Sequence, residues 1–137
     1  MKKLADLRGY LEKRIPDLKR NPDQLLVFIE DGRIIFYPAT NYSHNYKTAA
    51  RVIVTDWKGK TDDLIIAVLE WMSVREPGFN PETAIKFDLE ILDKETVDMA
   101  FTLEITERVI VALEDGKRIV THDLPEPPMQ MNPGARW

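Results

Sequence analysis

The chain has 137 residues, of which 44% are hydrophobic, and a formal net charge of −4 at pH 7. The length suits one domain with a sizeable core, and the acidic balance argues against a surface that neutralises nucleic-acid phosphates, because such a surface needs an excess of Lys and Arg. The absence of cysteine excludes disulfides and thiolate sites, and the lack of a signal-like start or a long apolar run predicts a protein of the cytosol or of a virion that does not enter a membrane.

The first part of the chain predicts a helix followed by a β-hairpin. Up to Pro16, apolar residues recur at three- and four-residue intervals between charged ones, which is typical of an amphipathic helix that ends before the proline. Residues 17–23 then predict a polar turn. The apolar runs 24–30 and 33–37 flank Asp31-Gly32, a pattern that predicts two strands joined by a tight turn. An alternative interpretation makes part of 22–29 helical.

The middle of the chain predicts a loop, a strand and a buried helix. Residues 38–47 form a polar connection with aromatic side chains, and residues 50–57 have the composition of a strand. Thr61 is the predicted N-cap of the next helix, because Asp62 and Asp63 follow it where carboxylates favour the helix dipole. The apolar positions of this helix continue until it stops before Pro77.

A long β-hairpin is the predicted centre of the fold. Four apolar residues of the segment 85–91 alternate with charged ones, which predicts a strand with one buried and one solvated face. A polar turn over 93–96 and renewed alternation over 97–105 predict the second strand. In 105–113 the alternation is lost, so this part is expected to be covered on both faces or to meet another subunit. Asp115-Gly116 predicts a turn before a short last strand at 117–121.

Together these elements predict an α+β fold with a mixed, mainly antiparallel β-sheet and helices packed on one face. One domain is expected over residues 1–123. Residues 124–137 contain four prolines and predict an extended C-terminal tail.

Catalytic chemistry has little support in the residues. Asp56, Asp62 and Asp63 surround a Lys-Gly-Lys loop and could hold a hard cation, but a strand end followed by a helix cap is the favoured explanation. His44 and His122 are the only histidines and have no further histidine or cysteine nearby in sequence, which disfavours a metal site or a triad. We therefore expect no catalytic residues, no bound metal and no cofactor.

Four short motifs occur in order along nearly the whole chain. They are Asn21-Pro22-Asp23, Val52-Ile53-Val54-Thr55-Asp56 ahead of Val68-Leu69-Glu70-Trp71, Leu103-Glu104-Ile105-Thr106-Glu107-Arg108, and Glu126-Pro127-Pro128. In these motifs the chain resembles the tail completion protein R family of contractile-tailed temperate phages and prophages, a tail-terminator-like group. The resemblance implies a non-enzymatic protein that caps the tail tube, stops its polymerisation and provides a surface for head attachment.

The resemblance also implies the partners. We expect a homo-oligomeric ring, with a hexamer as the leading expectation, in contact with the tail tube protein and with head–tail connector or neck proteins. DNA would pass through the lumen without sequence-specific binding, which agrees with the negative net charge. The expected location is the tail of the virion, after assembly in the host cytoplasm. A neck adaptor that never touches the tube and, less favoured, a small metal-dependent hydrolase using the three aspartates remain alternatives.

The predicted sites are therefore contact surfaces. Glu104, Glu107 and Arg108 are expected to join subunits through charged hydrogen bonds, which contribute more at an interface than on an exposed surface. The aromatic loop 42–46 is expected to face the tube or the neck. The predicted contact residues are Glu104, Glu107, Arg108, Ile110, Ala112, Tyr42, Tyr46, Met129 and Trp137.

Overall fold

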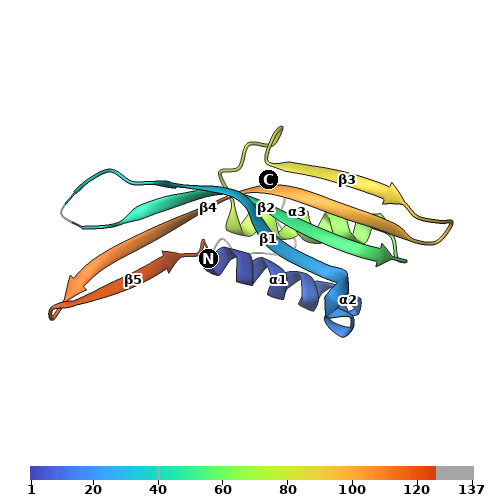
Figure 1. The fold of residues 1–137 in the computed structure, drawn as a ribbon, viewed down its shortest axis with the longest axis horizontal. Coiled ribbons are helices and arrows are strands. Elements are labelled where there is room, and N and C mark those ends of the chain that lie inside the picture. Colours follow the sequence, from blue (N-terminus) through green and yellow to red (C-terminus); the bar gives the residue numbers. More distant parts are fainter. Residues whose placement is uncertain (40, 126–137) are drawn as a thin grey trace, which may run out of the picture.

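The computed structural model describes residues 1–39 and 41–125 (Figure 1). The elements in chain order are α1 (Lys2–Arg14), α2 (Pro16–Arg20), a short 3-10 helix η1 (Pro22–Gln24), β1 (Leu25–Ile35), β2 (His44–Trp57), α3 (Thr61–Arg75), β3 (Ile85–Ile91), β4 (Val97–Glu114) and β5 (Lys117–Asp123). The strands form one sheet in the order β1-β2-β4-β3, and β5 also pairs with β4. Because every pairing is antiparallel, the predicted α+β class with a mainly antiparallel sheet is confirmed.

The 18-residue strand β4 organises the sheet. One of its edges pairs with β2, and the other edge is shared in succession by β3, opposite residues 97–103, and by β5, opposite residues 108–114. The predicted central hairpin of β3 and β4 is thus confirmed. Between these two partners, residues 104–107 face no strand of the described residues on that side, which leaves a gap in the ladder that other groups must fill.

The core lies between one face of the sheet and the two longer helices. Buried side chains alternate along β2 and β4, as in Val52 and Phe101, and they pack against Leu11 of α1 and Val68 of α3. Trp71 of α3 is 2% exposed, and its indole N–H donates to Asp6 of α1 at 2.8 Å. Each fully buried apolar side chain of this kind contributes about 1.5–3 kcal/mol. No helix of the described residues is both long and apolar enough to span a membrane.

The predicted hairpin over 24–37 is wrong, because this segment forms the single strand β1. The register of β1 against β2 shifts between Ile29 and Asp31, so Glu30 is accommodated as a bulge and the strand continues past Gly32. A turn of the predicted type instead occurs at Asp115-Gly116, where both residues have positive φ (49° and 77°). The helical alternative for 22–29 survives only as η1.

Three boundaries also differ from the predictions. The predicted turn over 17–23 contains α2 and the start of η1, because prolines at the first position of each suit a helix start. The predicted loop over 38–47 ends at His44, where β2 begins, so Tyr46 lies in a strand. Thr61 is the first residue of α3, not its cap, and no side chain caps this helix.

In both strands of this hairpin, the pattern of buried and exposed side chains differs from the predicted one. Phe87, Leu89 and Ile91 of β3 are 59%, 44% and 72% exposed, because β3 is an edge strand that the helices do not cover. In β4 the alternation continues through the segment predicted to lose it: Glu107 and Val109 are buried, whereas Ile110 between Val109 and Val111 is exposed.

Candidate interaction site

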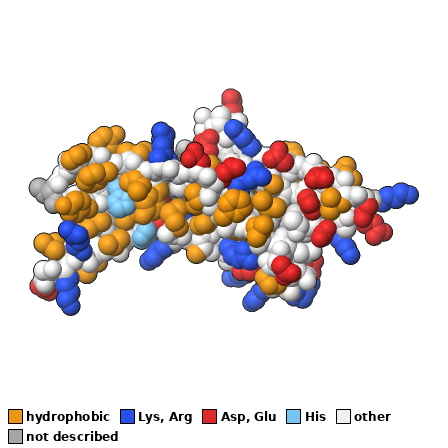
Figure 2. Space-filling view, in the orientation of Figure 1, with side chains coloured by type: hydrophobic (Ala, Val, Ile, Leu, Met, Phe, Trp, Pro, Cys, Tyr) orange, Lys and Arg blue, Asp and Glu red, His pale blue; other side chains and the backbone are white. Residues whose placement is uncertain are grey.

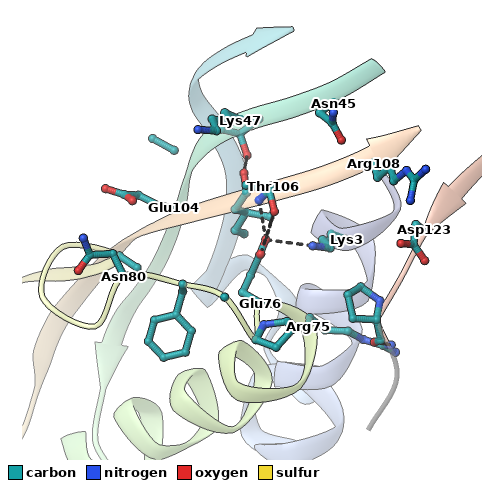
Figure 3. Close-up of a pocket in the computed structure, with 18 of the residues that line it drawn as sticks. Lys3, Asn45, Lys47, Arg75, Glu76, Asn80, Glu104, Thr106, Arg108 and Asp123 are labelled. Atoms are coloured by element: carbon teal, nitrogen blue, oxygen red, sulfur yellow. Dashed lines mark hydrogen bonds and ion pairs between the residues drawn. The ribbon is translucent and has the colours of Figure 1, made fainter. Parts of the chain in front are cut away.

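A hollow of about 860 Å³ lies at the gap along β4 (Figure 3). The connection between α3 and β3, residues 76–84, borders it on one side, and the exposed face of β1, β2 and β4 borders it on the other. Glu104 and Arg108, two of the predicted contact residues, line it together with Lys47 of β2 and Asp123 of β5. The structure therefore brings Glu104 and Arg108 to one exposed surface.

Glu76, which lines the hollow, supplies the hydrogen-bond acceptor that a strand partner would supply in the gap along β4. Its carboxylate accepts a hydrogen bond from the backbone N–H of Thr106 and another from the Thr106 hydroxyl at 3.0 Å. The Lys3 ammonium of α1 donates to the same carboxylate at 3.0 Å (Figure 3). Glu76 and Lys3 are 6% and 3% exposed, so each charge depends on the other for compensation.

Glu107 points to the opposite face of β4 and is 1% exposed. Its carboxylate accepts the backbone N–H groups of Lys3 at 2.9 Å and Lys2 at 3.3 Å, at the N-terminus of α1, and contacts the His122 ring of β5. Burial alone would raise the pKa of Glu107, but the Lys3 N–H, His122 and the Lys2 N–H together hold the pKa below its ordinary value of 4.5. The Glu107 carboxylate is buried and hydrogen-bonded within its own chain, so it is not available to a neighbouring subunit. The predicted charged contact between subunits therefore depends on Glu104 and Arg108 and stays a prediction.

Replacing Glu107 by Gln should lower the free energy of unfolding at about pH 7 by about 1–3 kcal/mol, because a buried charged acceptor becomes neutral. The folded-state pKa lies below 4.5, so the contribution of the ionised carboxylate is complete above about pH 4.5 and is lost as pH falls through the folded value. Urea unfolding of both proteins at decreasing pH should show their stabilities converging in acid. A stability difference that persists undiminished to about pH 3 would contradict this assignment.

The aromatic residues of the predicted contact loop lie close together at one end of the sheet. Tyr42 stacks on Phe36 with ring centroids 6.2 Å apart, and the Arg118 guanidinium of β5 lies 4.9 Å from the Tyr42 ring centroid. The centroid of the Tyr46 ring lies 5.2 Å from that of the His44 ring and 6.4 Å from that of the His122 ring. Two further predicted contact residues, Met129 and Trp137, lie outside the described residues.

This end of the sheet is a four-stranded extension beyond the N-terminus of α1, which we call the β arm (Figure 1). It comprises residues 31–35 of β1, 44–48 of β2, 108–114 of β4 and all of β5. In Figure 2 hydrophobic side chains gather over this end around the two histidines. Sequence reasoning had found only part of this surface, because the apolar runs of β1 and β5 are short and their exposure depends on where the helices lie.

Exposed apolar residues occur on both faces of the β arm. Cross-strand pairing places Ile34 beside Tyr46, and Val120 beside Val111, on the face that continues the helix-covered side. Leu113 shares that face and is 72% exposed. The predicted contact residues Ile110 and Ala112 lie on the other face with Ile119, which is opposite Ala112. Contiguous exposed apolar surface of this kind is typical of a protein–protein interaction site.

The three aspartates considered as a metal site do not form one in the described parts of the chain. Among residues 1–39 and 41–125, no group of three or more His, Cys, Asp or Glu side chains is arranged to hold a metal ion. The backbone N–H of Asp56 donates instead to Asp98 at 2.9 Å, and Asp62 and Asp63 occupy the first turn of α3, where carboxylates favour the helix dipole.

Comparison with known proteins identifies the family. No solved structure matches the chain. A curated relative, tail completion protein R of Escherichia phage P2, is 32% identical over 133 residues, which cover 93% of this chain and 85% of the relative. The family model described as P2 phage tail completion protein R (GpR) matches residues 1–127. The resemblance predicted from the four motifs is therefore confirmed, and the chain belongs to the P2 phage tail completion protein R family.

Proposed function

We propose that this protein completes the phage tail by capping the tail tube, stopping its polymerisation and presenting a surface to which the head attaches. The observation that supports the proposal is the β arm, an uncovered apolar surface in a member of a tail completion family. A monomer gains nothing from exposing Leu113 and Val120, whereas a structural protein can bury them against a partner. The proposed role is non-enzymatic, and its place is the tail of the virion, after assembly in the host cytoplasm.

A closed ring, with a hexamer as the favoured form, is part of the proposal. A cyclic ring needs two different surfaces on each subunit, one for each neighbour. The face of the β arm with Ile110, Ala112 and Ile119 offers an apolar surface, and the hollow with Glu104 and Arg108 offers a polar one. The opposite face of the β arm, with Leu113 and Val120, is left for the tail partner. In this arrangement the subunits contact the tail tube protein on one side and connector or neck proteins on the other, and DNA passes through the lumen without sequence-specific contacts.

Deleting the gene for this protein from its prophage tests the role directly. After induction, electron microscopy should show tails of abnormal length or tails separated from filled heads, and the wild-type gene supplied in trans should restore complete particles. Complete particles with tails of normal length in the deletion strain would contradict the proposal.

A pull-down distinguishes tail completion from the neck-adaptor alternative. The purified protein is mixed separately with purified tail tube protein and with purified neck protein. Tail completion predicts retention of the tube protein, whereas a neck adaptor would retain the neck protein alone. Retention of the tube protein should also decrease when the β arm is altered, because the proposal assigns apolar contacts to that arm.

A further inference from the structure

The outer edge of β3 is a regular open edge of the described sheet, as is the outer edge of β5 in the β arm. β3 pairs with β4 on one side over Ile85–Ile91 without a register shift. The edge of β1, by contrast, contains a bulge, and the Arg8 guanidinium donates to its Leu25 carbonyl at 2.9 Å. Bulges and covering groups protect an edge from pairing with another chain, and within residues 1–39 and 41–125 the outer edge of β3 has neither.

The backbone of β3 presents a defined set of free groups at this edge. At one end of the hairpin the N–H of Glu104 bonds the carbonyl of Ala84 at 2.9 Å, and at the other the N–H of Leu92 bonds the carbonyl of Thr96 at 3.0 Å. Because hydrogen-bonded residues alternate along an antiparallel strand, the even-numbered residues of β3 direct their backbone groups toward β4. The odd-numbered residues of β3 therefore direct their backbone N–H and carbonyl groups outward, away from β4.

The same odd-numbered residues carry the exposed apolar side chains of β3. Phe87, Leu89 and Ile91 lie on the helix side of the sheet, opposite Phe101, Met99 and Val97 of β4. Leu69 of α3 is also about half exposed. The indole N–H of Trp71 donates to Asp6 of α1, and helical periodicity places Leu69 on the other side of α3 from Trp71. The odd-numbered residues of β3 therefore combine outward backbone groups with exposed apolar side chains.

We propose that β3 pairs antiparallel with β3 of a second copy of this chain, about a two-fold axis at Asp88. In this register Lys86 lies opposite Glu90 of the second copy, Phe87 opposite Leu89 and Ile85 opposite Ile91. The charged residues thus form complementary pairs on one face and the apolar residues meet on the other, which are the cross-strand pairs that stabilise sheets. The seam forms about eight backbone hydrogen bonds and joins two sheets into one.

The seam contains one like-charge pair, Asp88 with Asp88 of the second copy. Arg51 of β2 offsets it, because its guanidinium lies 3.5 Å from the Asp88 carboxylate and donates to Thr102 at 2.7 Å. Other registers are worse. A one-residue shift turns apolar side chains toward charged ones, a two-residue shift in one direction sets Asp88 against Glu90, and the opposite shift leaves Glu90 and Ile91 without a partner in β3.

This pairing goes beyond the proposed function and does not depend on it. β3 pairs with the part of β4 farthest from β5, so it lies at the other end of the sheet from the β arm (Figure 1). A second copy on β3 therefore leaves the β arm free for a tail partner. The assays below use the purified protein alone, whereas tail completion is measured on phage particles, so failure of one does not imply failure of the other.

A single-cysteine comparison tests the register, since the natural chain has no cysteine. Asp88→Cys places two cysteines opposite each other at the two-fold axis in a non-hydrogen-bonded pair, with Cα atoms about 4.5 Å apart, which suits a disulfide. Lys86→Cys is the matched control on the same face of the strand. Its two copies lie four positions apart in register, about 13 Å, too far to bridge.

Mild oxidation of the dilute proteins should give a covalent dimer with Asp88→Cys, and on the order of tenfold less with Lys86→Cys. In light scattering, the unmodified protein should have at least twice the 15.9 kDa mass of one chain. Leu89→Lys, which adds a charge to the apolar face of the seam, should remove this pairing without lowering the melting temperature of the subunit, because Leu89 is 44% exposed. Equal cross-linking of the two cysteine variants, or pairing unaffected by Leu89→Lys, would overturn the proposal.

Discussion

Replacing Glu76 by Ala is expected to lower the free energy of unfolding by about 3–5 kcal/mol, because the change leaves the buried Lys3 ammonium without its counter-charge. The Glu76 carboxylate lies 3.0 Å from the Lys3 ammonium, and the two residues are 6% and 3% exposed. The same change also removes the acceptor for the Thr106 N–H, in the stretch of β4 that has β2 on one edge and no described strand on the other. The loss is to be measured by urea unfolding at neutral pH.

A double-mutant cycle separates the two effects. Lys3→Met removes the buried charge and keeps most of the side-chain volume, so the double variant Lys3→Met, Glu76→Ala should be more stable than Glu76→Ala alone. The free energy of unfolding of the double variant should remain about 1–3 kcal/mol below that of Lys3→Met alone, which is the cost of leaving a buried N–H without an acceptor. If Glu76→Ala alone changed the free energy of unfolding by less than about 1 kcal/mol, the pair would behave as a surface ion pair and its structural role would be refuted.

Two charges placed in the β arm should abolish tail completion while leaving the subunit folded. Leu113 and Val120 are 72% and 54% exposed and lie on the same face, so Leu113→Glu with Val120→Glu should cost the isolated subunit little. If both side chains are buried by a partner, the lost contacts amount to about 3–6 kcal/mol, or about a 10²- to 10⁴-fold weaker association. Complementation of the deleted prophage, scored as infectious particles, measures the effect.

Leu26→Glu is the matched control for the β-arm variant. Leu26 is 51% exposed and lies in β1 outside the β arm, so this change adds a charge to the same sheet without altering the proposed contact surface. It should complement the deletion normally. Melting temperatures of all variants verify folding. Full complementation by the doubly charged β arm, or equal loss with Leu26→Glu, would refute the assignment of the tail contact to this arm.

Local sequence patterns predicted most of the elements. The first helix, the buried helix α3 and the hairpin of β3 and β4 follow from apolar spacing that one segment contains by itself. The family was also visible in four short motifs. The candidate site was only partly predictable. Glu104 and Arg108 could be proposed as contact residues from the sequence, whereas the roles of Glu76, Lys3 and His122 required knowing which distant segments meet at the gap in β4.

Local sequence was enough for the fold class, the family and the alternation over residues 97–105 of β4, because these depend on neighbours in the chain. Contacts between distant segments decided which secondary structure and which degree of burial each pattern adopted. Of two Asp-Gly pairs, Asp115-Gly116 forms a tight turn, whereas Asp31-Gly32 lies in a continuous strand because β2 is long enough to pair with both halves of β1. Likewise, the alternating residues of β3 stay exposed because the helices cover the centre of the sheet and not this edge, and Glu107 is buried because the N-terminus of α1 supplies its hydrogen bonds.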